Sequence, residues 1–248
     1  MNQPLEVQES NFEELIRIPE EYQNKLKQLQ TVFEQIYQKY PFKVSNRISK
    51  EDEDNDLELG GQFTYGEIEF ISLGEIFYLL KNKYGVLQEQ DKDIFYDLGS
   101  GSGKPTIAAA LLHQFKAANG IELLKSLVSI SNDVKSDIEK NQQELYNQLN
   151  GIYGTRSCQY LQNINFQSQD FLQFDWSDAD LVFVNATCYD PPFLQKLYEK
   201  SLKMKKNSIF ITTTRKLPVQ NQTWQLLSFF KRKMDFGNAT VHIYQKLI

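Results

Sequence analysis

Hydrophobic positions along the chain follow two spacings, one typical of amphipathic helices and one typical of strands. The helical spacing is clearest between residues 21 and 40, where Pro41 marks the end of the pattern. Its apolar stripe consists of Leu26, Leu29, Val32, Phe33, Ile36 and Tyr37. A stripe of this width predicts a helix that packs on the rest of the chain. The same spacing predicts further helices over residues 68–84, 104–115, 123–149 and 190–202.

Short apolar runs rich in β-branched and aromatic residues lie between these helices and predict strands. The runs cover residues 94–98, 117–122, 163–166, 180–185 and 208–214, and two longer β-rich runs follow at 224–236 and 240–248. The run at 180–185 is almost continuously apolar, as expected for a strand buried on both faces. Strands that alternate with helices and then end in a hairpin predict an α/β fold with a doubly wound, mostly parallel sheet.

The N-terminal part of the chain differs in composition from the rest. We expect residues 1–61 to form a helical cap with an acidic loop, and residues 62–248 to form the main domain. The acidic run Glu51–Asp56 is typical of a solvated loop. Its functional alternative is a contact for a basic protein substrate.

A glycine-rich turn joins the first predicted strand to the following helix. Asp97 closes the strand, and Gly99, Gly101 and Gly103 follow at alternate positions before Pro105 in the first helical turn. The dinucleotide fingerprint spaces its glycines differently and seats a pyrophosphate on the helix N-terminus. An acid immediately before the turn repels a pyrophosphate and suits an ammonium or hydroxyl donor. Asp97 therefore favours S-adenosylmethionine over a dinucleotide.

Polar residues at the ends of later strands add candidates for the same site. Glu122 ends the second strand, where an acid can accept hydrogen bonds from both hydroxyls of a ribose. Asp170 and Phe171 follow the third strand and could bind the amino group and the ring of an adenine, or form a solvated turn and a core contact. Asn185 ends the fourth strand at the edge where ligands of such sheets bind.

Composition narrows the class of protein. The formal net charge of −5 argues against broad electrostatic binding of bare nucleic acid. Cys158 and Cys188 are the only cysteines, and with His113 and His242 they are too scattered for a zinc site. We expect no metal and two reduced packing thiols. The chain shows no signal peptide and no apolar run long enough to span a membrane, so we expect an intracellular protein that is not secreted.

Together these features resemble a class I S-adenosylmethionine-dependent methyltransferase, which implies a Rossmann-like, seven-stranded, mostly parallel sheet with helices on both faces. A closer resemblance covers roughly residues 62–215. It is to the catalytic domain of the non-SET histone-lysine methyltransferases of the Dot-one (disruptor of telomeric silencing) type. The matching segments are Thr64-Tyr65-Gly66-Glu67, Asp97-Leu98-Gly99-Ser100-Gly101, Gly120-Ile121-Glu122, Asp170-Phe171 and Val182-Phe183-Val184-Asn185.

This resemblance implies protein-lysine N-methylation with S-adenosylmethionine as the cofactor, on a substrate such as a nucleosomal histone, in the nucleus rather than the cytoplasm. It implies that Tyr65 and Glu67 contact the cofactor or close over it, and that Asn185 lines the channel to the target lysine. Asn185 and Tyr65 are the candidate catalytic residues. The candidate cofactor-binding residues are Thr64, Tyr65, Glu67, Asp97, Gly99, Ser100, Gly101, Glu122, Asp170, Phe171 and Asn185.

Two departures from the family bear on the substrate. The chain lacks the lysine-rich arm that holds nucleosomal DNA, and its nearest substitutes are the short clusters at 203–206, 215–216 and 231–233. The missing arm leaves two alternatives: a partner supplies the DNA contacts, or the target is a non-histone lysine. The chain also continues differently after Asn185, with Ala186-Thr187-Cys188-Tyr189.

Two alternative functions stay open. Asp190-Pro191-Pro192-Phe193 resembles the signature of enzymes that methylate exocyclic amines of flipped bases, although Asp190 lies five positions beyond the strand end. Because Pro also suits a helix start, we expect Asp190 to cap the following helix. The other alternative is a non-catalytic scaffold that retains the methyltransferase fold.

Overall fold

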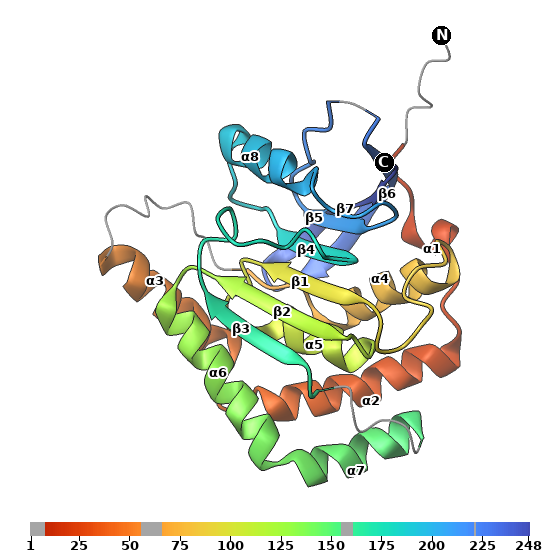
Figure 1. Ribbon diagram of the computed structural model, residues 1–248. Helices are drawn as coiled ribbons and strands as arrows, with labels where there is room; N and C mark the ends of the chain where they lie inside the picture. Colours follow the sequence, from red (N-terminus) through yellow and green to blue (C-terminus); the bar gives the residue numbers. More distant parts are fainter. Residues whose placement is uncertain (1–7, 56–65, 155–160, 221) are drawn as a thin grey trace.

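The computed structural model describes residues 8–55, 66–154, 161–220 and 222–248. Within these ranges seven strands form one mixed sheet at the centre of the molecule, in the order β3-β2-β1-β4-β5-β7-β6 (Figure 1). The strands are β1 (Ile94–Leu98), β2 (Ala117–Glu122), β3 (Ile164–Ser168), β4 (Leu181–Asn185), β5 (Ile209–Thr213), β6 (Trp224–Met234) and β7 (Gly237–Lys246).

Strands β1 to β5 are parallel, and β7 lies antiparallel between β5 and β6. The strand order reverses between β1 and β4, so the carboxyl ends of these two strands flank the point where ligands bind in such sheets. The sheet, the flanking helices and the terminal hairpin confirm the predicted class I methyltransferase fold.

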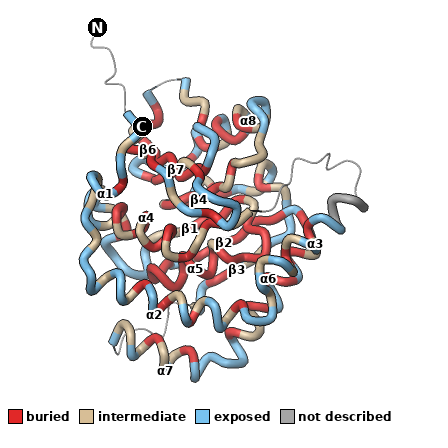
Figure 2. The backbone as a smooth tube through the Cα atoms, turned by 180° about the vertical axis from the view of Figure 1, so that it is seen from behind, coloured by how far each residue is buried: buried red, intermediate tan, exposed pale blue. Residues whose placement is uncertain are grey.

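The helices of the described residues are α1 (Phe12–Leu15), α2 (Glu20–Ile36), α3 (Phe42–Asn55), α4 (Phe70–Asn82), α5 (Lys104–Leu112), α6 (Lys125–Lys140), α7 (Gln142–Tyr153) and α8 (Pro191–Ser201). Alternate residues of each central strand enter two separate cores. Phe95 and Phe183 pack with α2, α4, α5 and α6 on one face, whereas Val182 and Val184 pack with α8 on the other. Figure 2 shows buried residues concentrated in the sheet and in α5.

Helix α2 carries the predicted stripe into the core. Leu26, Leu29, Val32 and Tyr37 are buried, and α2 packs against α4, α5 and α7. The Tyr37 hydroxyl donates to the carbonyl of Ser102 in the glycine-rich turn at 3.2 Å. The N-terminal helices therefore touch the segment that we expect to bind the cofactor.

The acidic run does not begin as a loop, contrary to the prediction. Helix α3 extends from Phe42 to Asn55 and therefore includes residues 51–55. Buried Ser45 and Ser49 lie on the same side of α3, which packs against α6. Glutamate is a good helix former, so packing of the first turns is enough to carry the helix into the acidic residues.

The helix predicted over residues 123–149 is two helices, because α6 ends at Lys140 and α7 begins at Gln142. Asn141 between them leaves the helical conformation, with φ −102° and ψ 17°. Its side-chain amide and its backbone N–H both donate to the carbonyl of Asp137, a local bond that competes with the helix. The break lets α6 pack on β3 while α7 turns away to pack on α2 (Figure 1).

Candidate active site

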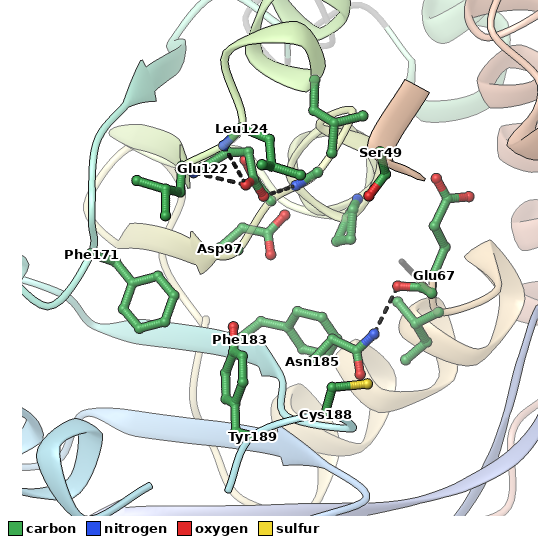
Figure 3. A pocket seen from close by; sticks show the side chains of 18 of the residues that line it. Ser49, Glu67, Asp97, Glu122, Leu124, Phe171, Phe183, Asn185, Cys188 and Tyr189 are labelled. Atoms are coloured by element: carbon green, nitrogen blue, oxygen red, sulfur yellow. Dashed lines mark hydrogen bonds between the residues drawn. The ribbon is translucent and has the colours of Figure 1, made fainter. Parts of the chain in front are cut away.

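A pocket opens at the carboxyl ends of β1, β2 and β4 (Figure 3). Its described lining consists of Ser49, Gly66, Glu67, Ile68, Asp97, Gly99, Ser100, Gly101, Pro105, Glu122, Leu123, Leu124, Leu127, Asp170, Phe171, Phe183, Asn185, Cys188, Tyr189 and Phe193. The lining thus joins residues from both halves of the sheet, from α3 and from the segment that precedes α4.

Asp97 is the most deeply buried acid of the pocket, with only 1% of its surface exposed. Its Oδ2 accepts a hydrogen bond from the Thr106 hydroxyl at 2.8 Å. Burial, together with the nearby charge of Glu122, raises the pKa of Asp97 to about 7 despite the opposing hydrogen bonds of Thr106. A carboxylate held in this way is stabilised by a cationic ligand group.

Glu122 fixes the glycine-rich turn against the end of β2. Its Oε2 accepts from the backbone N–H of Gly101 at 2.8 Å, and its Oε1 accepts from those of Leu123 and Leu124 at 2.7 and 2.9 Å. Gly101 has φ +55°, a left-handed conformation that glycine adopts without strain. Glu122 also lines the pocket, at the strand end where an acid can accept hydrogen bonds from ribose hydroxyls.

Aromatic side chains close the pocket below the end of β3. Phe171, Tyr189 and Phe193 form one cluster, with the Tyr189 and Phe193 ring centroids 4.5 Å apart. Asp170 beside them accepts from the backbone N–H of Leu172 at 2.8 Å. An acid next to a wall of aromatic rings is suited to a purine base.

Glu67 lines the pocket but its carboxylate is already engaged. Lys104 Nζ lies 2.7 Å from Glu67 Oε2, and both side chains are about nine-tenths buried. The Ser102 hydroxyl donates to Glu67 Oε1 at 3.4 Å. This ion pair ties the segment before α4 to the start of α5, so Glu67 reaches a ligand only alongside Lys104.

Asn185 ends β4 at the opposite side of the pocket from Glu122. Its Nδ2 donates to the carbonyl of Gly66 at 2.7 Å (Figure 3), and its Oδ1 accepts from the hydroxyls of Thr187 and Thr213 at 2.7 and 2.6 Å. Gly66 is packed closely, since a Cβ there would lie 2.7 Å from the ring of Phe236. The amide therefore joins β4, β5 and the segment before α4.

The structure brings the predicted residues that it describes around this one pocket. These are Glu67, Asp97, Gly99, Ser100, Gly101, Glu122, Asp170, Phe171 and Asn185. Thr64, Tyr65 and Cys158 lie outside the described residues, whereas Cys188, predicted as a packing thiol, lines the pocket.

Sequence reasoning missed Ser49 and Tyr189 in the lining. Phe193 was noticed only within its Pro-Pro-Phe motif. The Pro-Pro-aromatic pattern was the available signal for Phe193, and no local pattern marks Ser49.

The charge of the lining decides which cofactor fits. Four acids, Glu67, Asp97, Glu122 and Asp170, line the pocket, and among the described lining residues there is no lysine, arginine or histidine. A pyrophosphate is repelled there, whereas the ammonium and sulfonium groups of S-adenosylmethionine are attracted. The residues present thus fit this cofactor.

The fold and this pocket define a class I S-adenosylmethionine-dependent methyltransferase. The sequence model of the family described as histone methylation protein DOT1 matches residues 45–235. The match covers most of the chain, so the chain belongs to the DOT1 histone methylation family. A comparison with curated proteins gives no match.

Solved structures with the same fold include several methyltransferases of RNA. The rRNA methyltransferase aviRa from Streptomyces viridochromogenes is 13% identical, with a TM-score of 0.51 over 73% of this chain and 86% of that chain. An RNA methyltransferase from Salinibacter ruber, in complex with S-adenosyl-L-homocysteine, is 20% identical, with a TM-score of 0.44 over 69% of this chain and 90% of that one. At these identities the likeness shows the fold alone.

Two further features concern the part of the chain that the structure describes. None of its helices combines the length and the apolar character needed to cross a membrane. No group of three or more histidine, cysteine, aspartate or glutamate side chains in these ranges is arranged to hold a metal ion.

Proposed function

We propose that this chain is an S-adenosylmethionine-dependent protein-lysine N-methyltransferase and that its target is a histone lysine in the nucleus. The observation that carries the proposal is the match to the DOT1 histone methylation family. The matched segment contains Gly66 and Asn185 as well as Asp97 and Glu122, so it includes both ends of the pocket.

Different acids of the pocket bind different groups of the cofactor. Asp97 receives the ammonium group, Glu122 receives the ribose hydroxyls, and Asp170 with Phe171 receives the adenine. S-adenosylmethionine supplies an electrophilic methyl group on a positively charged sulfur. These residues would hold the cofactor at the end of the pocket opposite Asn185, where it would supply that methyl group.

The target amine enters at the end lined by Gly66, Phe183 and Asn185, which carry no charge. An ammonium has no lone pair, so the amine loses its proton to solvent first, and burial favours the neutral form. Bound S-adenosylmethionine would supply the methyl group, so the Nζ lone pair would form the new N–C bond while the C–S electron pair leaves on sulfur. The methylated Nζ would then release its extra proton to solvent. Alignment and exclusion of water supply the rate enhancement.

The N-terminal helices are part of this proposal as a cap over the domain 62–248. Ser49 of α3 lines the pocket, and Tyr37 bonds the glycine-rich turn. The cap thus contributes to the pocket through α3, which packs against α6. Whether residues 51–56 also contact a basic substrate is tested by substituting them together and measuring the KM for a histone.

The basic clusters differ in their position relative to the pocket. Lys205 pairs with Asp180, which precedes β4, so the cluster at 203–206 lies at the far edge of the sheet. Arg215 and Lys216 follow β5 at the pocket edge and are exposed. We propose that 215–216, with the exposed Lys231 and Lys233 near the end of β6, meet nucleosomal DNA, weakly or with the help of a partner, whereas Arg232 between them pairs with Glu75.

The test is transfer of a labelled methyl group from S-adenosylmethionine to four separate substrates. They are reconstituted nucleosomes, free core histones, nuclease-treated cell extract and total nucleic acid. Label on nucleosomes supports the proposal, and label on one non-histone protein keeps the lysine chemistry with another target. Label on nucleic acid alone overturns the proposal. Cofactor binding with no transfer at all indicates the scaffold.

Variants in the Asp190 motif distinguish protein-lysine methylation from methylation of an exocyclic amine. Asp190 caps α8, because its Oδ1 accepts from the backbone N–H of Phe193 at 2.8 Å, as expected from the sequence. Phe193 lines the pocket and Asp190 does not. On a protein substrate, Asn185→Ala is expected to abolish transfer and Asp190→Ala to preserve it. The reverse result on nucleic acid favours an exocyclic-amine methyltransferase.

A further inference from the structure

The amide of Asn185 is bonded at both of its ends, and its surroundings fix which end is which. The Gly66 carbonyl 2.7 Å away can only accept a hydrogen bond, so the atom that faces it is Nδ2. Oδ1 therefore faces Thr187 and Thr213, at 2.7 and 2.6 Å. Since Oδ1 can only accept, both hydroxyls donate to it.

The direction of the next bond follows from proton counting. A hydroxyl has one proton, and Thr187 uses its proton on Asn185. In the contact between Thr187 and Thr214, whose oxygens lie 2.9 Å apart, Thr214 must then be the donor. The network runs in one direction, from Thr214 through Thr187 to Asn185 and from Asn185 to the carbonyl of Gly66.

This direction limits what the pocket can offer to a target amine. A neutral amine attacks with its lone pair, so its N–H groups need acceptors, and a donor aimed at the lone pair would block the reaction. Asn185 Oδ1 already receives two hydrogen bonds, and Nδ2 is a donor. The Gly66 carbonyl receives one hydrogen bond within the described residues and keeps a second lone pair, and Gly66 lines the pocket.

We propose that the carbonyl oxygen of Gly66 accepts an N–H of the target lysine amine, and that Asn185, Thr187 and Thr213 are positioning residues that hold this carbonyl. The inference rests on the proposed lysine methylation. It changes the role of Asn185 from a group that binds the amine to a group that orients the backbone which does.

The segment of Gly66 is also held from the side of the terminal hairpin. Asp235 Oδ1 accepts from the backbone N–H of Glu67 at 2.9 Å, and the N–H of Asp235 donates to the carbonyl of Glu67 at 3.0 Å. The ring of Phe236 packs where a Cβ of Gly66 would lie. A carbonyl fixed between β4 and the hairpin is already in place before the substrate arrives, as a positioned acceptor requires.

Thr214 shows that the network is maintained at a cost. Its φ of +62° is left-handed, which is rare for a β-branched residue. Its backbone N–H donates to the carbonyl of Thr240 at 2.7 Å, and its hydroxyl contacts Thr187. Strained backbone of this kind persists where surrounding contacts over-determine it, typically at functional sites.

The first variant is Asn185→Asp, which replaces the Nδ2 donor with an oxygen and repels the Gly66 carbonyl. We expect kcat on the lysine substrate to fall about a hundredfold, as for a misplaced reacting group, with an unchanged Kd for S-adenosylhomocysteine. If Asn185 bound the amine directly through Oδ1, a carboxylate would accept at least as well. Undiminished kcat in Asn185→Asp therefore overturns the proposal.

The second variant, Thr213→Val, removes one hydroxyl donor without changing the shape of the side chain. We expect a fall in kcat of about tenfold, the effect of one hydrogen bond, with an unchanged KM for the cofactor and rescue by Thr213→Ser. The matched control is Thr212→Val on the same strand, because the Thr212 hydroxyl donates to the carbonyl of Arg215 instead. An equal fall in kcat in Thr212→Val and Thr213→Val, or no rescue by serine, overturns the positioning role.

A readout that does not need turnover separates this inference from the proposed function. In ¹⁵N-labelled protein, the side-chain amide resonance of Asn185 is expected to shift in Thr213→Val and to stay in place in Thr212→Val. An unchanged resonance in Thr213→Val contradicts the network. A wild-type protein that methylates no lysine overturns the proposed function, whereas an active wild type with a fully active Asn185→Asp overturns only this inference.

Discussion

The two halves of the pocket are built by different means. The cofactor half consists of Asp97, Gly99, Gly101, Glu122 and Asp170, at the ends of β1, β2 and β3. Most of the groups that hold its carboxylates are close to them in the chain, such as Thr106 for Asp97 and the two residues after Glu122, and the most distant is Gly101, 21 positions from Glu122.

The acceptor half is lined by Gly66 and Asn185, and Thr187, Thr213 and Phe236 hold these two residues from outside the lining. It joins four separate segments of the chain, and its key bond links Asn185 to Gly66 across 119 positions. The cofactor half is therefore a local solution that many methyltransferases can share. The acceptor half depends on contacts between segments that only tertiary packing brings together.

The largest effect is expected from a substitution that weakens cofactor binding in the cofactor half alone. Asp97→Asn removes the buried charge that we propose receives the ammonium group of the cofactor. Loss of one partner of a buried charged pair costs about 2–5 kcal/mol, so the Kd for S-adenosylmethionine is expected to rise about a hundredfold or more, as measured by calorimetry.

Asp190→Asn is the matched control for this change, because it removes an acid outside the pocket and keeps a good helix cap. It is expected to bind the cofactor normally. Normal binding by Asp97→Asn would refute the assignment of Asp97 and with it the division of the pocket.

The pH dependence of cofactor binding gives a second test of Asp97 in the cofactor half. Burial raises the pKa of Asp97 to about 7 in the protein without ligand, and the ionised form is the one that binds an ammonium. Affinity is therefore expected to fall about tenfold per unit as the pH drops below 7, and to level off above it. A pH-independent Kd between pH 5.5 and 8 would contradict this, and Asp97→Asn should show no such slope.

The stability of the ligand-free protein should change in the opposite sense. Because the pKa of Asp97 is higher in the folded protein than the value of about 3.9 in an unfolded chain, the folded state keeps a proton that the unfolded state has lost. This group therefore makes stability fall as the pH rises from about 4 to 7. Asp97→Asn removes that decline, so its Tm at pH 8 is expected to exceed that of the wild type.

The two halves also differ in how far the sequence predicts them. Asp97 and Glu122 could be found because each ends a recognisable strand, and the structure places both in the pocket. The strands, the hairpin and the cap by Asp190 were likewise visible in local patterns. No local pattern pairs Gly66 with Phe236 or Asn185 with Thr213, because tertiary packing alone brings these residues together.

The two wrong predictions about helices, at the acidic run and at Asn141, have a similar origin. The acidic run 51–55 was interpreted from composition, whereas the packing of α3 on α6 decides its conformation. The break at Asn141 was hidden because the apolar spacing continues across it. Only the side-chain bond to Asp137 and the different partners of α6 and α7 explain why one predicted helix is two.

A smaller effect is expected at the junction of the cofactor half with the glycine-rich turn. Glu122→Gln replaces one acceptor oxygen with an NH2 group, which leaves at least one of three backbone N–H donors unpaired. An unsatisfied buried donor costs about 1–3 kcal/mol, so the free energy of unfolding is expected to fall by about that amount, with weaker cofactor binding. Chemical denaturation and calorimetry on the same variant measure the two effects. Unchanged stability with weakened binding would mean that Glu122 serves the ligand alone.

The smallest expected effect tests the boundary of the acceptor half. Asp190→Ala removes the N-cap of α8, which costs about 1 kcal/mol and lowers the Tm by about 2–4 °C. Because Asp190 is exposed and outside the lining, kcat on a protein substrate is expected to stay at the wild-type value. Asp190→Asn, which keeps the cap, should restore the Tm. Loss of methyl transfer in Asp190→Ala with normal cofactor binding would extend the acceptor half to the Asp-Pro-Pro-Phe motif and favour an exocyclic amine as the substrate.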